Sequence, residues 1–200
     1  MDLFSFPKEI QLDMLDAEVY YYPGFLNEKS SDSLFKHLIE STPWQQDSIT
    51  IYGKTHLQPR LTALYGEKDK TYAYSNITMH PHFFSIELTD IKEQIELFTK
   101  KRFTSCLLNL YRHGNDSNGW HSDDERELGI NPVIASLSLG AERIFHFKHK
   151  TIKNLKQKLV LQHGSLLLMS GETQHKWLHQ LPKTQKKIGK RINLTFRNIA

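Results

Sequence analysis

Hydrophobic positions near the start of the chain recur at helical spacing. The run "EKSSDSLFKHLIE", residues 28–40, places four apolar side chains on one face of a helix: Leu34, Phe35, Leu38 and Ile39. Asn27 stands directly before this run, where its side chain can accept a hydrogen bond from the first turn. The pattern predicts a helix that Asn27 caps.

A second helical pattern lies near residue 95. Ile91, Ile95 and Phe98 have the spacing of one helix face. Asp90 with Glu93 resembles a capping box at its start, and the basic residues 100–102 suit the negative end of a helix dipole. We therefore expect Asp90 to cap this helix, which would begin at Ile91.

From Cys106 onward the hydrophobic period changes from helical to two. Short alternating runs are separated by Gly, Asn and Pro: "CLLNLYRHG", "PVIASLSLG", "RIFHFKH", "QKLVLQHG", "SLLLMSG", "HKWLHQLP" and "RINLTFRN". Seven short strands in this half are typical of a sandwich or jelly roll rather than of parallel α/β units. The chain is therefore predicted to be α+β and mainly β, and 200 residues favour a single domain.

Charge is unevenly distributed along the chain. The net charge is +4, but residues 141–200 hold 13 Lys or Arg and 2 acids, which gives +11 there and −7 in the first 140 residues. Such a basic segment suits a polyanion, although a generic basic surface explains the charge equally well.

Composition indicates a reducing compartment. Cys106 is the single cysteine, so no disulfide framework can form within the chain. The first residues carry acids and lack a sustained apolar stretch, so we expect no signal peptide. The longest apolar run, "LLLM", is too short to span a bilayer, and we expect no membrane association.

The stretch "GWHSDDE", residues 119–125, indicates a metal site. His121 and Asp123 are two residues apart at a strand end, so both side chains lie on one face. One further histidine would complete the two-histidine, one-carboxylate set of non-haem iron(II) oxygenases, which leaves coordination positions open. The candidates are His163, His175 and His179, and the pattern by itself does not choose among them.

The last strand adds an anion site to this interpretation. In "RINLTFRN", Ile192, Leu194 and Phe196 share one face, and the other face carries Arg191, Asn193, Thr195 and Arg197. Asn109 and Tyr111 likewise share a face of an earlier strand, opposite Cys106, Leu108 and Leu110. Two arginines on one face of a central strand are costly unless an anion meets them, so these side chains suit a small dicarboxylate.

In combination, "NLYRHGNDSNGWHSDDE", "HGSLLLMSGETQHKWLHQLP" and "KRINLTFRNI" resemble the AlkB family of iron(II)- and 2-oxoglutarate-dependent dioxygenases. The likeness is greatest to its duplex-DNA repair branch, the one resembling human AlkB homolog 2. The family implies a double-stranded β-helix (jelly roll) core at residues 103–198, a nucleotide-recognition lid at 49–88, and an N-terminal extension and helix at 1–48. It also implies oxidative removal of N-linked methyl groups from 1-methyladenine and 3-methylcytosine in DNA, with release of formaldehyde.

The resemblance assigns the iron and cosubstrate residues. His121, Asp123 and His179 would bind Fe(II), with His179 chosen for its "LHQLP" context. Arg197 would pair with the distal carboxylate of 2-oxoglutarate, and four residues would complete the cosubstrate site: Asn109, Tyr111, Arg191 and Asn193. Molecular oxygen would be the oxidant. His163 and His175 would then be structural or surface groups.

Substrate residues also follow from the resemblance. Tyr72 and Tyr74 in "TYAYSN" would line the pocket for a flipped base. Glu125, assisted by Asp124, would face the cationic methylated ring, although either acid can instead pair with Arg126.

The same resemblance predicts the DNA contacts. Tyr52, at the tip of a hairpin in "ITIYGKTHLQPR", would fill the gap that base flipping leaves, with Lys54 and Arg60 near phosphate. The run "LPKTQKKIGK" would contact phosphates of both strands through Lys183, Lys186, Lys187 and Lys190.

Three other interpretations compete with this one. They are an oxygenase of the same kind that acts on RNA or protein, a non-catalytic binder of damaged DNA, and a zinc hydrolase. The last leaves Arg191 and Arg197 unexplained. We expect a monomer in a bacterial cytoplasm near the nucleoid, or in the nucleus of a eukaryote.

Overall fold

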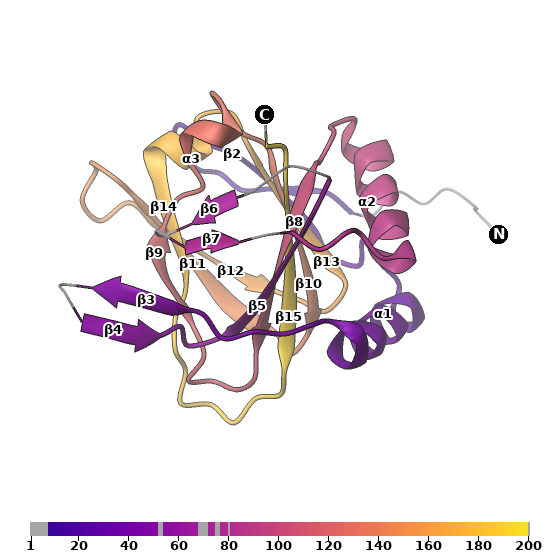
Figure 1. Cartoon of the computed structure of the whole chain (residues 1–200). Helices are drawn as coiled ribbons and strands as arrows, with labels where there is room; N and C mark the ends of the chain where they lie inside the picture. Colours follow the sequence, from indigo (N-terminus) through magenta and orange to yellow (C-terminus); the bar gives the residue numbers. More distant parts are fainter. Residues whose placement is uncertain (1–7, 52–53, 68–71, 75–76, 80, 200) are drawn as a thin grey trace.

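The computed structural model describes residues 8–51, 54–67, 72–74, 77–79 and 81–199. Its strands form two antiparallel sheets of seven and four strands, and helices α1 and α2 lie to one side of them (Figure 1). The described chain is mainly β, and the jelly-roll prediction is confirmed.

The larger sheet contains four of the seven strands predicted from the alternating runs. Its order is β1 (Ile10–Gln11), β2 (Glu18–Tyr22), β13 (Ser165–Ser170), β10 (Ile134–Gly140), β15 (Arg191–Arg197), β8 (Ser105–Tyr111) and β5 (Leu61–Gly66). Strand β15 is central, as expected. The sheet also includes β1, β2 and β5, which precede the range 103–198 expected for the core.

The smaller sheet contains the other three predicted strands and a short fourth one. Its order is β12 (Lys156–Leu161), β11 (Arg143–His149), β14 (Trp177–Leu181) and β9 (Asn118–His121). Strand β9 is therefore an edge strand, and it pairs with β14.

Alternation along the central strand separates two environments. Ile192, Leu194 and Phe196 join the core that packs under the helices, together with Cys106, Leu108 and Leu110 of β8. The intervening residues of both strands, Arg191 and Asn109 among them, line a pocket between the sheets. Both faces predicted for these strands are confirmed.

Helix α1 (Glu28–Ser41) begins as predicted. Asn27 Oδ1 accepts a hydrogen bond of 2.9 Å from the Ser30 amide, and Leu38 is buried against the larger sheet. The side-chain cap satisfies an amide that has no partner within the helix.

The prediction for the second helix start is wrong. Helix α2 (Ile86–Thr99) begins five residues earlier than expected, and its cap is Ser85, whose Oγ accepts from the Leu88 amide. Asp90 therefore lies inside the helix. Serine and aspartate cap almost equally well, so the local sequence did not decide between them.

Two hairpins and two short helical segments complete the described chain. The hairpins are β3 (Ser48–Ile51) with β4 (Lys54–Leu57) and β6 (Tyr72–Tyr74) with β7 (Ile77–Met79), and both lie outside the two sheets (Figure 1). The helical segments are the 3-10 turn η1 (Arg126–Leu128) and α3 (Thr173–Lys176). Among the described residues, every helix is too short or too polar to cross a membrane.

Candidate active site

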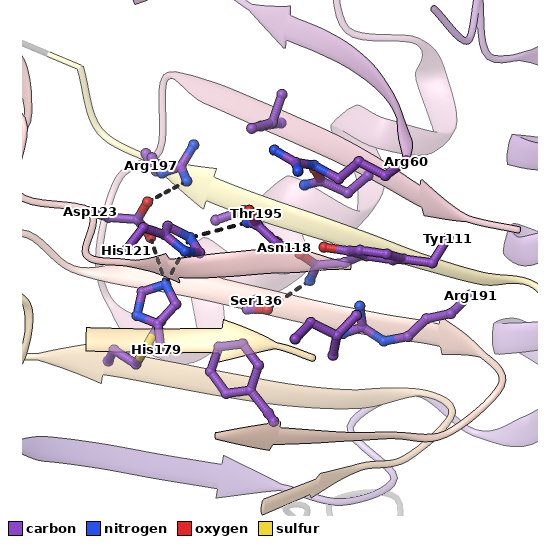
Figure 2. Close-up of a pocket in the computed structure, with 16 residues that line it drawn as sticks. Arg60, Tyr111, Asn118, His121, Asp123, Ser136, His179, Arg191, Thr195 and Arg197 are labelled. Carbon is purple, nitrogen blue, oxygen red and sulfur yellow. Dashed lines mark hydrogen bonds and ion pairs between the residues drawn. The ribbon is translucent and has the colours of Figure 1, made fainter. Parts of the chain in front are cut away.

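Two adjacent strands bring together three side chains that can bind one metal ion. His121 of β9 lies opposite His179 of β14 in the strand register, and their Nε2 atoms are 3.1 Å apart. Asp123 follows β9, and its Oδ2 is 3.8 Å from His179 Nε2. One ligand atom from each residue lies within 4.8 Å of the others, and Figure 2 shows the three groups converging.

Neighbouring side chains fix the carboxylate of this group. Arg197 Nη2 donates to Asp123 Oδ1 at 2.6 Å, and both side chains are buried. The Asp123 amide donates to Gln174 Oε1 at 3.0 Å, and Gln174 is fully buried. Asp123 is thus held at its side chain and at its backbone.

The protonation states suit metal binding. Desolvation raises the pKa of Asp123, but the Arg197 guanidinium and the two imidazoles outweigh it and leave that pKa below the usual value. Desolvation, with a smaller contribution from His121, lowers the pKa of His179 to about 3. The site therefore presents a carboxylate and a neutral imidazole at neutral pH, which are the forms that bind metals.

The donor set fits iron(II). Two imidazoles and one carboxylate on one side of an ion leave its other positions open, as in non-haem iron oxygenases. The structure therefore brings together the residues predicted as ligands.

The other two candidate histidines lie elsewhere. His175 belongs to helix α3 and not to the strand predicted from "HKWLHQLP", which begins only at Trp177. Its Nε2 accepts from the Asn131 amide, and His163 Nδ1 accepts from the Gly140 amide. Both contribute to loop structure, and neither is among the residues that line the pocket.

The pocket extends along β15 and β8 from the three candidate metal ligands His121, Asp123 and His179, which are called the metal group below. Arg197 lies at the metal end and Arg191 at the other end, six residues along the same strand. Asn193, Thr195, Asn109 and Tyr111 also line the pocket, and Figure 2 shows Thr195 and Tyr111 among its labelled side chains. All five predicted cosubstrate residues thus line one pocket.

This arrangement contradicts the expected role of Arg197. Its guanidinium binds the candidate ligand Asp123, so it lies beside the three candidate metal ligands and not at the distal end of the pocket. Arg191 lies at that distal end and is therefore placed for a distal carboxylate. The sequence showed two arginines on one face but not which one the metal ligands would approach.

Arg191 is available to an anion. It is 2% exposed, its Nη2 donates to Ser138 Oγ at 2.9 Å, and its guanidinium carbon lies 5.4 Å from the Tyr111 ring centroid. Within the described structure its buried Nε has no hydrogen-bond partner. Burial lowers the pKa of Arg191 to about 10, so the group stays charged at neutral pH and an anion would offset its desolvation.

Sequence reasoning did not identify Arg143 as a buried arginine that packs on Tyr111. This residue is 4% exposed at the start of β11, and its Nη2 donates to the carbonyls of Asp116 and Pro182. Its guanidinium carbon is 5.9 Å from the Tyr111 ring centroid, on which Arg191 also packs. A signal was present, because alternation in "RIFHFKH" places Arg143 on the same face as the buried Phe147.

Arg60 also differs from expectation. It was predicted to contact phosphate, but it is 5% exposed in the wall of the pocket, and its Nε donates to Asn109 Oδ1 at 2.8 Å. A buried guanidinium bound to a cosubstrate-site amide is not a surface phosphate contact. The correction arises because β5, which begins at Leu61, lies in the larger sheet and draws Arg60 inward.

The acids after Asp123 have different surroundings. Asp124 Oδ2 accepts from Lys150 Nζ at 2.8 Å, so its ion-pair partner is Lys150 rather than Arg126. Glu125 is half-buried and directly precedes η1. Tyr72 and Tyr74 belong to β6, but the positions of their side chains lie outside what the structure describes.

Five of the predicted DNA contacts are exposed lysines. Tyr52 is outside the described residues, although β3 and β4 pair as the expected hairpin on either side of it. Lys54 is exposed, as are four lysines between β14 and β15: Lys183, Lys186, Lys187 and Lys190. The latter segment is anchored at its start, because Pro182 accepts from Arg143 and the Thr184 amide donates to Gly114 at 2.8 Å.

Comparison with known proteins identifies a family model and several relatives that match this chain. A family model described as the 2OG-Fe(II) oxygenase superfamily matches residues 18–197. Relatives from Bos taurus and Homo sapiens named alpha-ketoglutarate-dependent dioxygenase alkB homolog 3 are 45% and 42% identical over 193 residues. These matches cover 92% of this chain and 66% of each relative, so the chain spans just under two thirds of their length.

Two further comparisons extend the likeness. The protein named DNA oxidative demethylase ALKBH2 from Homo sapiens is 34% identical over 202 residues, which cover 96% of this chain and 76% of that relative. A solved structure of OsALKBH1 matches with a TM-score of 0.62 and 17% identity, over 96% of this chain and 100% of that one. At that identity the structural match bears on the fold alone.

Proposed function

The chain belongs to the AlkB family of the 2OG-Fe(II) oxygenase superfamily, and we propose that it removes N-linked methyl groups from 1-methyladenine and 3-methylcytosine in DNA. The observation that carries the proposal is the pocket between the sheets. At one end it has three side chains that could hold a metal ion, His121, Asp123 and His179, and at the other the buried Arg191, whose Nε has no partner in the described structure. This pair of sites suits an iron ion and a dicarboxylate bound together.

Each residue of the pocket has a distinct task. His121, Asp123 and His179 would hold iron(II), and Arg197 would keep Asp123 ionised and oriented. Arg191, beside Tyr111 and Ser138, would bind the distal carboxylate of 2-oxoglutarate. Arginine suits this task because its planar guanidinium can donate two parallel hydrogen bonds to a carboxylate.

The hydrogen bond from Arg60 to Asn109 positions that amide in the pocket wall. Asn193 Nδ2 is likewise fixed, by Ser136 Oγ at 2.7 Å. Side chains that are held in this way can orient a bound cosubstrate without reorganising.

The chemistry requires oxidation of a carbon that no side chain here could attack. Iron(II) and 2-oxoglutarate with molecular oxygen would supply hydroxylation of the N-methyl carbon, after which formaldehyde leaves and the base is restored. The chain itself would admit the base and exclude bulk water. Glu125, two residues after the ligand Asp123, would lie near the mouth and favour a cationic methylated ring over a neutral one.

Human ALKBH2 is named a DNA oxidative demethylase, and that name supports DNA as the substrate here. Use of duplex DNA is a further part of the proposal. The β3–β4 hairpin would carry Tyr52 into the gap left by a flipped base, and the exposed lysines after β14 would contact both strands.

The test is mass spectrometry of oligonucleotides that contain 3-methylcytosine or 1-methyladenine, incubated with the protein, iron(II), 2-oxoglutarate and oxygen. We expect the methyl mass to disappear only with the wild type and only with the cosubstrate, with His121→Ala as the inactive control. Unchanged DNA accompanied by steady formation of succinate would reject the DNA substrate and point to RNA or protein.

The duplex proposal has its own test. Tyr52→Ala should slow repair of duplex DNA far more than repair of single strands. Only in a duplex does base flipping leave a gap in the base stack that the Tyr52 side chain would fill. Equal losses on both substrates would rule out the wedge.

A further inference from the structure

An exposed tryptophan lies beside the iron ligands. Trp120 immediately precedes His121 on β9, and its ring lies against Lys148 of β11 and is not among the residues that line the pocket. It is 37% exposed. Consecutive Cα atoms are about 3.8 Å apart, so the backbone of Trp120 directly adjoins that of the candidate ligand His121.

The indole extends across the outer face of the smaller sheet. Lys148 Nζ of β11 lies 4.5 Å from the centroid of the Trp120 ring, yet β14 separates β9 from β11. The ring must therefore pass over the outer face of β14. Trp177, His179 and Leu181 of β14 are buried on the inner side, which leaves Leu178 and Gln180 on this outer face.

Positive charge adjoins the ring. Lys148 pairs in register with Lys156, and the next outward pair is His146 with Lys158. No carboxylate in the described part of the chain forms an ion pair with Lys148, Lys156 or Lys158. This face therefore combines an accessible aromatic ring with lysines that lack acidic partners.

We propose that Trp120 forms a subsite for the nucleotide next to the target base in single-stranded DNA. The neighbouring base stacks on the indole, and the lysines of β11 and β12 meet the backbone. Proteins bind single strands through this combination of aromatic rings and positive charge. The inference rests on the proposed function, because a base held in the pocket would leave its neighbour at the strand that carries His121 and Trp120.

The subsite distinguishes a single strand from a duplex. In a duplex the neighbouring base remains paired and stacked, so it is not available to the indole. In a single strand it is free to stack. Lys148 now covers part of the ring, but an exposed cation–π contact is weaker than base stacking, so a base can displace the ammonium toward a phosphate.

The experiment pairs changes in the protein with changes in the DNA. Single-stranded 11-mers with a central 3-methylcytosine carry one abasic spacer, either immediately 5′ or immediately 3′ of the modified base, or none. Fluorescence anisotropy gives the affinity of each for the wild type, Trp120→Leu and Trp120→Phe. The leucine variant keeps an apolar side chain without a π face, and the phenylalanine variant keeps the face.

We expect one of the two spacers to weaken wild-type binding about tenfold, within the range for loss of one stacked base. Trp120→Leu should weaken binding of the intact strand by a similar factor and should no longer respond to that spacer. Trp120→Phe should recover most of both effects. A general defect in folding could not reproduce this dependence on one position of the DNA.

Two outcomes would overturn the subsite. One is a Trp120→Leu variant that keeps the full response to both spacers. The other is an equal loss of affinity in Trp120→Leu for every oligonucleotide, with a spacer or without one. If Trp120→Leu were unstable, wild-type binding would be followed by tryptophan fluorescence, and quenching that persists in Trp120→Phe would reject stacking on Trp120.

Failure of the subsite and failure of the proposed function can be told apart. Methyl removal from the intact strand by the wild type tests the activity, whereas the spacer response tests the subsite. Methyl loss without coupling between Trp120 and a spacer would reject the subsite alone. Coupling between Trp120 and a spacer without loss of the methyl group would support the subsite and reject the proposed dealkylase activity.

Discussion

The pocket between the sheets and the exposed segment between β14 and β15 both carry positive charge, but they hold it in different ways. Arg60, Arg191 and Arg197 are each at most 5% exposed and bind named oxygen atoms. Lys183, Lys186 and Lys187 are exposed, and the described structure shows no carboxylate paired with them. Fixed guanidinium groups can select one small anion by geometry, whereas exposed lysines attract any polyanion and are screened by salt.

The comparison predicts that changes in the pocket affect chemistry and that changes outside it affect DNA affinity. The largest expected loss of activity comes from replacing one of the three candidate metal ligands. His121→Ala should eliminate both methyl removal and succinate formation, because one of three ligands is removed. His175→Ala is the matched control, since that exposed histidine lies on α3, and it should retain activity in the same assay. An inactive His175→Ala with an active His121→Ala would reverse the ligand assignment.

The two arginines of β15 should differ in what they bind. Arg191→Lys is expected to raise the KM for 2-oxoglutarate by about tenfold or more, because the distal carboxylate then has one charged hydrogen-bond donor fewer. Arg197→Lys should chiefly weaken iron binding, since Arg197 contacts Asp123. Succinate formation against 2-oxoglutarate concentration and iron titration separate the two effects. The opposite pattern would restore Arg197 to the distal end.

A smaller effect is expected from Gln174, which touches Asp123 only through the backbone amide. Gln174→Leu should weaken iron affinity about tenfold, at the lower end of the range for residues that orient metal ligands. Gln174→Glu keeps an oxygen acceptor and should weaken it less. Calorimetric titration with iron(II) without oxygen measures both variants, and unchanged affinity in Gln174→Leu would show that Arg197 alone orients Asp123.

Replacing Lys183, Lys186 and Lys187 by glutamine should reduce duplex affinity and leave succinate formation unchanged. The slope of log affinity against log salt should fall by about 0.9 for each phosphate that the protein no longer neutralises. Lys29→Gln is the control, because that exposed lysine lies on α1, on the far side of the larger sheet. An unchanged slope in the triple variant would remove this segment from the DNA surface.

The smallest expected effect concerns pH and the metal-free protein. The pKa of His179 is about 3 in the folded state, against about 6.5 in an unfolded chain. As pH falls below about 6.5, the unfolded state takes up a proton that the folded state does not, so stability decreases toward acid pH. This residue should contribute at most about 1.4 kcal/mol per pH unit. Urea unfolding of the metal-free protein at pH 7.5, 6.5 and 5.5 measures the trend, and His179→Gln should flatten it.

The sequence by itself determined the strands of the jelly roll and the faces of β8 and β15. A hydrophobic period of two is a property of the local sequence, because side chains alternate wherever the backbone is extended. It also determined that His121 and Asp123 form a pair, because residues two positions apart at a strand end point to the same face. The helix that Asn27 caps follows from the same kind of local rule.

Only the tertiary structure decided which distant groups meet. The register of β14 against β9 placed His179 opposite His121. The approach of Asp123 to Arg197 left Arg191 at the distal end of the pocket, and the position of β5 drew Arg60 into the pocket wall. Gln174 and Trp120 gave no sequence signal for their positions. Contacts between strands depend on sheet order and register, which arise from packing of the whole core and not from the residues beside each group.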